Sequence, residues 1–351
     1  MMQTDDIIFV AGHRGTAGTA LVEQLQLRGF KNIVTKTHAE LDLCNQQAVN
    51  QFFESVHPDY VFNCAVKPCG AANTRDKADF IYQNLMMQSN LIHASYLYKA
   101  KKLISFGSGY MYPEMAENPL KESCMLTGSL NWGVEYYAIA KIANAKMCEA
   151  YNLQYGTQFL TVVINNLYGT RAEFDFKKAR VLPALLRKFH LARLLYENRK
   201  ADVLSDLRMT DFEEAQKYLA SVGVTAQAVE IWGTGKARRA FVHRDDVADA
   251  CIYLMNHISF EDLKKYESGE IRSTHINLGT GTDYAIGDVA RMIKDIVGFN
   301  GELRFDTTKP DSNMNRVMDC TKIHDLGWHH HIDLPDGIRM MYDWYCKHHN
   351  E

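Results

Sequence analysis

Short, mostly apolar runs alternate with longer amphipathic stretches over the first half of the chain. Such runs are typical of strands buried on both faces of a parallel sheet, and the stretches between them repeat apolar residues at helical spacing. The alternation predicts βαβ units and an α/β fold, a Rossmann-type doubly wound parallel sheet. Predicted strands span 7–11, 32–35, 60–65, 102–106, 159–164 and 276–279; predicted helices run from the first glycines to Arg28, over 49–56 and 79–99, through Tyr137 to about Tyr155, and over 181–190, 247–255 and 286–297.

The regular alternation ends after Gly169. We therefore expect a first domain over 1–170, joined by about 239–258 and 274–280, and a smaller, mostly C-terminal α/β domain over 171–238 and 281–351. Residues 194–228 look like an insertion in the second domain, and the amphipathic stretch 211–219 predicts a surface helix within it. A lid, an oligomer contact and a passive decoration are all open for this insertion.

Composition and charge narrow the class of protein. The 351 residues carry a formal net charge of −3, and 46% are hydrophobic and 23% charged, as in a soluble globular enzyme. The charge balance disfavours nucleic acid as a partner, no apolar run approaches the ~20 residues that span a bilayer, and the first residues do not resemble a signal peptide. We expect a cytoplasmic protein without a membrane partner.

Cysteine and histidine spacing argues against disulfide and metal chemistry. The eight cysteines are scattered and form no Cys-x-x-Cys pair, so free thiols are expected. The run His329–His331 has no partner at ligand spacing, and we interpret it as a polar loop. No metal site is predicted.

Three glycines predict a nucleotide site. Gly12, Gly15 and Gly18 follow the first predicted strand and open a helix, which is the context of a dinucleotide-binding fingerprint. Such glycines let backbone N–H groups approach a pyrophosphate at the helix N-terminus. The spacing is Gly-x-x-Gly-x-x-Gly rather than Gly-x-Gly-x-x-Gly, and a glycine turn without a ligand is the alternative interpretation.

Two cations near these glycines predict the coenzyme. Proteins that bind NAD usually end the second strand with an acidic residue, but here that strand runs into Lys36, and Arg14 lies inside the glycine turn. Two cations with no carboxylate between them suit a 2′-phosphate, so NADP(H) is predicted. Asp42 is a candidate for an adenine contact, with a structural Asx cap as the alternative.

Tyr137 and Lys141 lie four residues apart on a predicted helix, hence on one face. A lysine there favours the charged form of the phenol and lowers its pKa, so the tyrosine can protonate a developing alkoxide. This spacing alone is common on solvated helix faces, but the glycine turn and Ser108, at the carboxyl end of a predicted strand, favour a carbonyl-reducing trio. Ser108 would bind the substrate carbonyl, Tyr137 would protonate it, and Lys141 would hold the nicotinamide ribose. Candidate coenzyme-binding residues are Gly12, Arg14, Gly15, Gly18, Lys36, Asp42, Ala65 and Lys141.

Nine stretches, nearly end to end, carry a family resemblance: 11–15, 82–86, 137–143, 166–169, 183–187, 232–235, 241–243, 276–281 and 309–311. They resemble the extended short-chain dehydrogenases/reductases and, more narrowly, the GDP-L-fucose synthase family of 3,5-epimerase/4-reductases. The resemblance implies a homodimer in which the first domain binds NADP(H) and the second a GDP-sugar. Arg and Lys suit a diphosphate, although each candidate alone could be an ordinary surface cation or core aromatic. By resemblance, the nucleotide sugar would be held by Asn166, Lys188, Trp232, Arg239 and Lys309.

Two positions depart from the family where its epimerase step needs an acid and a base. The family's cysteine after the catalytic serine is replaced by Tyr110, and its histidine before the Pro-Ala-Leu-Leu helix by Arg180. A guanidinium stays protonated in proteins, and a phenol with a pKa near 10 is a poor replacement for a thiol near 8.5. We therefore predict C4 reduction of a GDP-4-keto-6-deoxy-sugar without epimerase activity, with Tyr110 and Arg180 as substrate contacts. A relocated acid or base at Cys69, Cys124 or a nearby histidine is the alternative.

The reductase would make precursors of surface polysaccharides or glycans, with a dehydratase upstream and a separate epimerase in the pathway. Changes at 64–69 and 164–165 suggest a remodelled sugar pocket, for a heptose or a differently configured keto sugar. A bifunctional GDP-L-fucose synthase is the close alternative. A 4,6-dehydratase or 4-epimerase, and a redox-sensing NADP-binding module without turnover, are further alternatives, which the missing acidic residue beside Ser108 and the intact trio disfavour.

Overall fold

The computed structural model describes residues 1–68, 76–311 and 316–348. The chain divides into two compact units, which we call units 1 and 2. Unit 1 comprises Met1–Leu167, Arg244–Gly281 and Val317–His331, and unit 2 comprises Tyr168–His243, Thr282–Arg316 and Ile332–Glu351. The segment 317–331, expected in the second domain, thus belongs to unit 1.

Hydrogen bonds explain why the segment 317–331 belongs to unit 1. The side-chain amide of Asn277 donates to the carbonyl oxygen of Asp319 at 3.0 Å. The ammonium of Lys322 donates to the carbonyl oxygens of Ser273 and His275 at 2.8 and 3.1 Å. These contacts tie a segment from late in the chain to the last strand of the main sheet.

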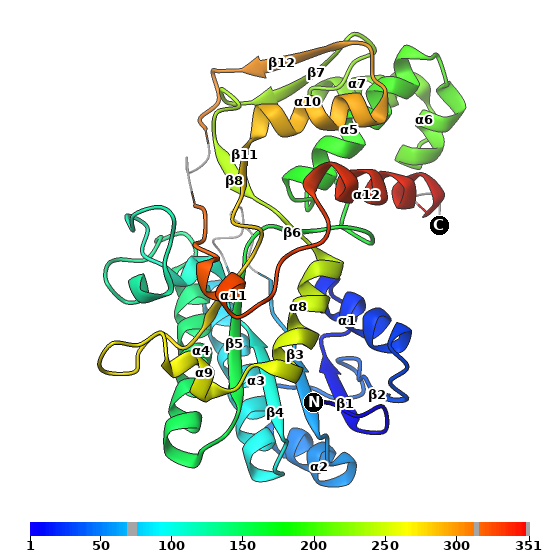
Figure 1. Cartoon of the computed structure of the whole chain (residues 1–351). Coiled ribbons are helices and arrows are strands. Elements are labelled where there is room, and N and C mark those ends of the chain that lie inside the picture. Colours follow the sequence, from blue (N-terminus) through cyan, green and yellow to red (C-terminus); the bar gives the residue numbers. More distant parts are fainter. Residues whose placement is uncertain (69–75, 312–315, 349–351) are drawn as a thin grey trace. The chain divides into compact units, whose positions relative to one another are not determined.

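Unit 1 is built on a six-stranded sheet with the strand order β10-β5-β4-β3-β1-β2 (Figure 1). Every neighbouring pair of strands in this sheet is parallel. The order reverses between β1 and β3, which makes this the topological switch point where ligands bind in open α/β sheets. The strands are β1 (Ile7–Ala11), β2 (Asn32–Val34), β3 (Tyr60–Asn63), β4 (Lys102–Phe106), β5 (Phe159–Ile164) and β10 (Ile276–Leu278).

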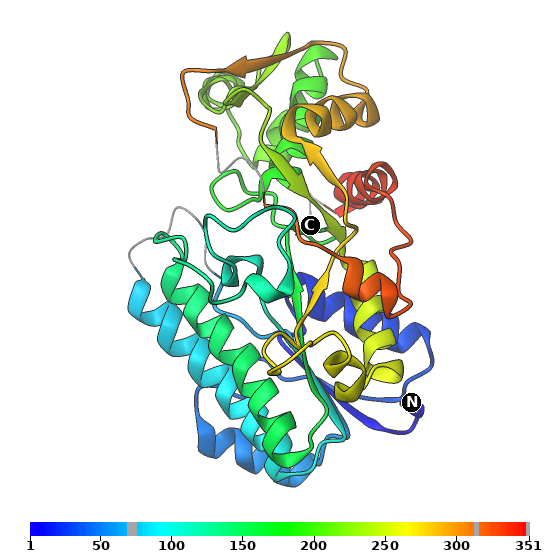
Figure 2. The same ribbon diagram turned by 60° about the vertical axis from the view of Figure 1, so that its left-hand side comes forward.

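Helices cover both faces of this sheet. The long helices α3 and α4 lie side by side on one face with α2, and α1 packs against α8 on the other (Figure 2). Phe9, Phe53, Val61, Leu91 and Leu103 are buried at the centre of the core on the α3 face. The helices are α1 (Thr16–Leu27), α2 (Gln46–Val56), α3 (Lys77–Leu97), α4 (Glu135–Tyr155), α8 (Arg244–His257), α9 (Phe260–Lys264) and α11 (Thr321–Asp325), with 3₁₀ turns η1 (Gly109–Met111) and η2 (Glu122–Cys124).

Unit 2 combines helices with two-stranded pairs. The strands β7 and β12 are parallel, whereas β8 and β11 are antiparallel. A further short pair joins β6 (Leu167–Tyr168) and β9 (Val242–His243). The other elements are β7 (Ala228–Trp232), β8 (Arg238–Ala240), β11 (Asp283–Ala285), β12 (Glu302–Asp306), α5 (Val181–Tyr196), α6 (Lys200–Leu207), α7 (Phe212–Ser221), α10 (Ile286–Val297) and α12 (Leu334–His348).

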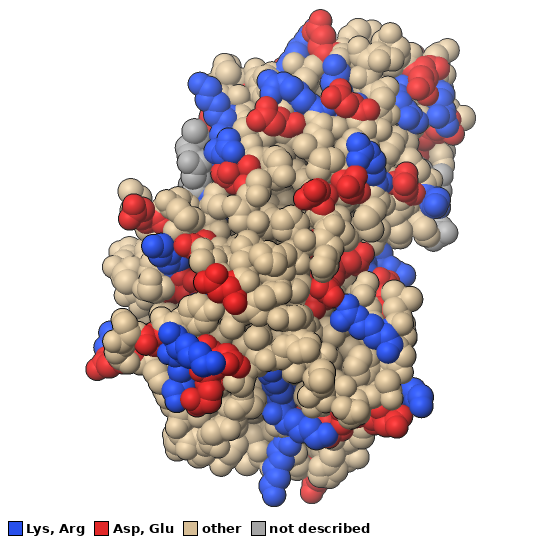
Figure 3. Space-filling view, in the orientation of Figure 1, with Lys and Arg blue, Asp and Glu red and all other residues tan. Residues whose placement is uncertain are grey.

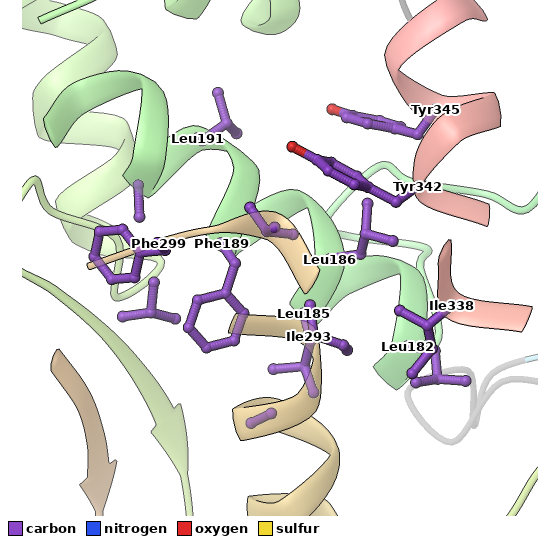
Figure 4. Close-up of a cluster of buried hydrophobic side chains, with 14 of the residues drawn as sticks. Leu182, Leu185, Leu186, Phe189, Leu191, Ile293, Phe299, Ile338, Tyr342 and Tyr345 are labelled. Carbon is purple, nitrogen blue, oxygen red and sulfur yellow. The ribbon is translucent and has the colours of Figure 1, made fainter. Parts of the chain in front are cut away.

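The core of unit 2 lies where α5, α10 and α12 meet. Figure 4 shows Leu182, Leu186 and Phe189 on α5 facing Ile293 of α10 and Ile338 of α12. The helix α5 extends beyond the predicted end at residue 190, because the apolar face continues through buried Leu191 and Leu194. The predicted helix at 286–297 is confirmed by α10.

The segment 194–228 is part of this core rather than a passive decoration. Val203 of α6 and Ala215 and Leu219 of α7 are fully buried in the same cluster as α5. The buried carboxylate of Asp206 accepts a hydrogen bond from the guanidinium of Arg187 at 2.9 Å and another from the hydroxyl of Tyr345. The surface helix predicted at 211–219 is confirmed by α7, which Asp211 caps through the backbone N–H of Glu214.

The six predicted strands of the main sheet and the doubly wound α/β fold are confirmed. The described residues contain no helix that is both long and apolar enough to cross a membrane, and among them no group of three or more His, Cys, Asp or Glu side chains is placed to hold a metal ion. On the face drawn in Figure 3, Lys and Arg are interspersed with Asp and Glu. A cytoplasmic location remains a prediction.

Replacing Leu219 by Ala tests the packing of the segment 194–228. We expect the Leu219→Ala variant to lose about 2–5 kcal/mol of unfolding free energy, because a fully buried leucine leaves a cavity behind. Urea denaturation measures this loss. Leu27→Ala, at a leucine that is 80% exposed, is the matched control and should change the free energy by less than about 0.5 kcal/mol. Equal effects of the two substitutions would contradict the packing argument.

Candidate active site

The glycine turn lies at the switch point of the sheet, between the carboxyl ends of β1 and β3. Gly12 has a φ of +77°, and a Cβ on it would lie 2.7 Å from the backbone nitrogen of Ala65. A Cβ on Gly18 would lie 2.3 Å from the carbonyl oxygen of Gly12. Neither position can take a side chain, so α1 starts directly against the turn.

The N-terminus of α1 fits a phosphate group. Its N-cap residue Gly15 has no capping side chain, and its first turn contains no acidic residue. The first backbone N–H groups of a helix have no partners within the helix and carry a partial positive charge. The crowded glycines and this helix end together form the cradle that a dinucleotide pyrophosphate requires.

The predicted 2′-phosphate site contains one residue that the sequence argument overlooked. Arg14 is exposed and Lys36 half-buried, but the ammonium of Lys36 lies 3.8 Å from a carboxylate oxygen of Glu40. The Glu40 carboxylate accepts hydrogen bonds from the backbone N–H and the hydroxyl of Thr37, both at 2.7 Å, and these lower the pKa of Glu40. A charged carboxylate therefore accompanies Lys36. Asp42 accepts a hydrogen bond from the backbone N–H of Cys44 at 2.9 Å, which forms a local Asx turn; the helix cap of α2 is Asn45.

Ser108 lies in a tight turn directly beyond the end of β4. It is 9% exposed, and its hydroxyl oxygen accepts a long hydrogen bond of 3.4 Å from the backbone N–H of Tyr110. Gly109 lets the side chain of Asn165 approach this turn closely, since a Cβ there would lie 2.5 Å from Oδ1 of Asn165. With the oxygen accepting from Tyr110, the hydroxyl proton of Ser108 is available for a substrate.

Tyr137 and Lys141 share one face of α4, as their spacing predicts. The ammonium of Lys141 lies 5.9 Å from the centre of the Tyr137 ring. Tyr110 also contacts Tyr137: its ring centre is 6.4 Å from that of Tyr137, with the two planes at 81°. The structure therefore gathers Tyr110, Tyr137 and Lys141, together with the turn that carries Ser108, in unit 1.

Lys141 is an ammonium held inside the protein. It is 2% exposed and donates a hydrogen bond to the carbonyl oxygen of Phe106 at 2.7 Å. With the Gln88 amide oriented to satisfy both of its ends, its oxygen accepts from Lys141 at 2.9 Å and its nitrogen donates to the carbonyl of Ala140 at 3.1 Å. Burial lowers the pKa of Lys141 to about 7. The nearby Cys64 thiol is half-buried, and desolvation raises its pKa.

In unit 2, two segments distant in the sequence come together around Trp232. The carboxylate of Asp311 accepts hydrogen bonds from the backbone N–H and the hydroxyl of Thr234, at 2.9 and 2.7 Å. This contact holds the turn after β7 and places the Lys309 ammonium 5.9 Å from the ring centre of Trp232. Trp232 is 73% exposed, so its face is open to a flat partner such as a base or a sugar.

The other candidates for the nucleotide sugar occupy different elements. In unit 2, Lys188 on α5 donates to the carbonyl oxygen of Glu230 at 3.3 Å, and burial lowers its pKa. Arg239 lies on β8, where its guanidinium donates to the carbonyl of Arg238 at 2.7 Å. Arg180 is the exposed N-cap residue of α5. In unit 1, Asn166 follows β5 with a φ of +43°.

Comparison with known proteins identifies the family. Residues 8–269 match the family model described as "NAD dependent epimerase/dehydratase family".

The chain belongs to this family.

Within the NAD dependent epimerase/dehydratase family, the chain is similar to sugar-nucleotide enzymes over nearly its whole length. It is 41% identical to "GDP-L-fucose synthase 1" of Arabidopsis thaliana, over 97% of this chain and 93% of that protein. Two solved structures from Campylobacter jejuni superpose with a TM-score of 0.92 each. One is a GDP-D-glycero-L-gluco-heptose synthase in the presence of NADPH, 60% identical over 99% of both chains. The other is a GDP-mannoheptose C4 reductase with NADP bound, 59% identical over 99% of this chain and 100% of that chain. The predicted relationship to GDP-L-fucose synthases is confirmed.

The sequence argument overlooked three residues near the candidate site, and two of them had no sequence signal of their own. Gln88 and Asp311 act through contacts with residues 53 and 77 positions away in the chain, so spacing could not reveal them. Glu40 was visible in principle, because it lies four residues after Lys36, the distance of a local ion pair. Cys69, one of the candidates for a relocated acid or base, lies outside the described residues. Cys124 lies on η2, is half-buried and forms no disulfide.

Replacing Lys141 by Met tests whether burial of the ammonium destabilises the folded protein. An unfolded lysine has a pKa near 10.4, whereas burial lowers that of Lys141 to about 7. In the coenzyme-free wild type, burial of the charged lysine therefore lowers the unfolding free energy by its full amount below pH 7. This destabilisation disappears as the pH rises to about 10.4. We expect Lys141→Met to be more stable than wild type at pH 6, on the order of a few kcal/mol, with the gain shrinking toward pH 10. Thermal unfolding of both proteins across this range measures the difference, and a difference independent of pH would contradict the assignment.

Proposed function

We propose that this protein is an NADPH-dependent reductase that reduces C4 of a GDP-4-keto-6-deoxy-sugar, a hexose or a heptose, without epimerase activity. The observation that carries the proposal is the grouping of the Ser108 turn, Tyr137 and the buried Lys141 in unit 1, beside a cradle that fits a dinucleotide. The relatives support the coenzyme and the reaction, since two of them were solved with NADPH or NADP and one is named a C4 reductase. Their names also favour a heptose.

Each residue of the trio has one task. NADPH, when bound, supplies the hydride that adds to the carbonyl carbon. The hydroxyl of Ser108 donates a hydrogen bond to the carbonyl oxygen, and Tyr137 transfers its proton to that oxygen as negative charge develops on it. Lys141 has three N–H donors, of which Phe106 and Gln88 take two. The third can hold a ribose hydroxyl of the coenzyme.

The groups of unit 2 suit the nucleotide part of the substrate. Lys188, Arg239 and Lys309 supply positive charge for a diphosphate, and the exposed face of Trp232 suits stacking on a base or sugar. The guanidinium of Arg180 supplies a further cation. This assignment is part of the proposal, as are the coenzyme roles of Arg14, Lys36, Asp42 and Ala65.

The absence of epimerase activity is proposed from the chemistry of two side chains. Epimerisation at C3 and C5 removes and returns a proton at carbon, which requires a base and an acid. Arg180 cannot give up its proton, and the ring of Tyr110 stands edge-on to Tyr137 where the family has a thiol. A 4-keto substrate must be formed by a dehydratase acting upstream, and any inversion would come from a separate epimerase. A bifunctional GDP-L-fucose synthase is the alternative.

A homodimer is also proposed. Apolar side chains that are exposed on the adjacent helices α3 and α4 would be covered by a second copy of the chain, since exposed apolar groups on paired helices are typical of interfaces. The residues are Tyr82, Leu97, Ile139, Leu153 and Tyr155.

Replacing Tyr137 by Phe separates a reductase from a binding module. We expect NADPH oxidation with GDP-4-keto-sugars to fall by about 10²–10⁴-fold in Tyr137→Phe, because the variant lacks the proton donor, while NADPH binding is largely retained. The assay is run over a panel of GDP-4-keto hexoses and heptoses, with product configuration determined by NMR. Tyr136→Phe, one residue earlier on the same helix, is the control and should retain full turnover. If no keto sugar is consumed by the wild type, the reductase proposal is wrong.

Solvent deuterium tests the loss of the epimerase step. In heavy water, proton exchange at C3 or C5 would introduce deuterium there, so we expect product made by this protein alone to carry none at either carbon. NMR and mass spectrometry of the product measure the label, and a GDP-L-fucose synthase run in parallel is the positive control. Deuterium at C3 or C5 would show that an acid and a base act elsewhere in the site and would favour the bifunctional alternative.

A further inference from the structure

The amide of Gln88 contacts the ammonium of Lys141 and also the backbone of the helix that carries it. Gln88 lies on α3, is 1% exposed, and has its oxygen 2.9 Å from the ammonium of Lys141. Its nitrogen donates to the carbonyl oxygen of Ala140, the residue before Lys141 on α4. The side chain of Gln88 is thus hydrogen-bonded both to the ammonium of Lys141 and to the backbone just before that residue.

The hydrogen bond from Lys141 to Gln88 is important because few other groups restrain the ammonium. Phe106 offers a carbonyl oxygen from the end of β4 at 2.7 Å. Among the described residues, the other titratable groups that face Lys141 are the Cys64 thiol beyond β3 and Tyr137 on its own helix. No carboxylate contributes to the shift of its pKa, which burial dominates. The strongest acceptors are therefore two neutral oxygens, one from the backbone and one from Gln88.

We propose that Gln88 is a positioning residue, whose carboxamide holds the ammonium of Lys141 in the orientation that serves both Tyr137 and the coenzyme ribose. The inference rests on the proposed reductase function. Gln88 touches neither reacting atoms nor coenzyme in this account; it acts through Lys141 alone. A neutral acceptor keeps the ammonium in place without forming an ion pair, so that the positive charge remains available to Tyr137.

Two substitutions of nearly equal size should act in opposite directions. Gln88→Glu places a negative charge beside the ammonium and favours its charged form, whereas Gln88→Met removes an acceptor from the charged form and disfavours it. Activity that requires the ammonium falls as the pH rises through the pKa of Lys141. We expect the alkaline midpoint of kcat to move up by about one pH unit or more in Gln88→Glu and down in Gln88→Met, relative to wild type.

Binding of NADPH gives a second measurement, without turnover. The dissociation constant of NADPH, measured by nicotinamide fluorescence from pH 6 to 10, should increase when Lys141 loses its proton. Its midpoint should move in the same two directions as that of kcat. Asn90→Asp is the matched control, because Asn90 is a buried amide on the same helix that donates to the carbonyl oxygen of Leu43 instead; its midpoints should equal those of wild type.

The outcomes separate this inference from the function on which it rests. Opposite shifts in Gln88→Glu and Gln88→Met support the positioning role. Midpoints that stay in place, that move the same way in both variants, or that move equally in Asn90→Asp would overturn it, even when the wild type reduces a keto sugar. If the wild type consumes no keto sugar, the proposed function fails, and the NADPH-binding midpoints still decide the role of Gln88.

Discussion

An ammonium group enclosed by protein is the costly element on which the site depends. Taking a charge out of water disfavours the charged form, and here burial lowers the pKa of Lys141 to about 7. The cost is offset only where the surrounding structure supplies acceptors at fixed positions. Those acceptors come from β4 through Phe106 and from α3 through Gln88, so the ammonium can be held only after the sheet and both long helices have packed. Fold and chemistry are therefore linked at this residue.

The order of the strands explains why the other parts of the site lie nearby. In a doubly wound sheet, the loops on either side of the switch point diverge and leave a crevice at the carboxyl ends of the strands. The crevice lies between β1 and β3, where Gly12 meets the backbone of Ala65. The next strand, β4, ends just before Ser108. The glycine turn and the groups proposed to donate protons thus lie together because of one topological feature.

The sequence predicted the parts of this arrangement that depend on local pattern. The glycine turn, the pair Tyr137 and Lys141 and the position of Ser108 can be read from spacing, because strand, turn and helix form within a short stretch of chain. Contacts between distant segments could not be read in this way. Gln88 on α3 meets Lys141 on α4, and Asp311 fixes the turn beside Trp232, although nothing in the spacing of either pair indicates a contact.

The unit to which the segment 317–331 belongs and the pair of strands β7 and β12 were not predicted, because both depend on contacts between distant parts of the chain. The segment 317–331 was expected with its sequence neighbours, but its hydrogen bonds to Asn277 and to the chain before β10 place it in unit 1. The parallel pair β7 and β12 was not predicted, since the segment Arg244–Gly281 of unit 1 lies between its strands in the sequence. In addition, β7 has exposed as well as buried residues, and β12 has only exposed and half-buried ones. A strand is recognised from the sequence when its burial is uniform, as in β3 and β4.

The contrast between the two halves of the family's chemistry carries the argument about activity. Reduction needs a proton delivered to oxygen, and Lys141, which lies beside the proposed donor Tyr137, is held by the carbonyl of Phe106 and by the buried amide of Gln88. Epimerisation needs protons moved at carbon by a thiol and an imidazole, whose only requirement is a pKa within reach of neutrality. At the two corresponding positions this chain has Tyr110 and Arg180. The proposed loss of the epimerase step is compatible with the proposed reduction, because the two steps would share a substrate but not their proton-transferring groups.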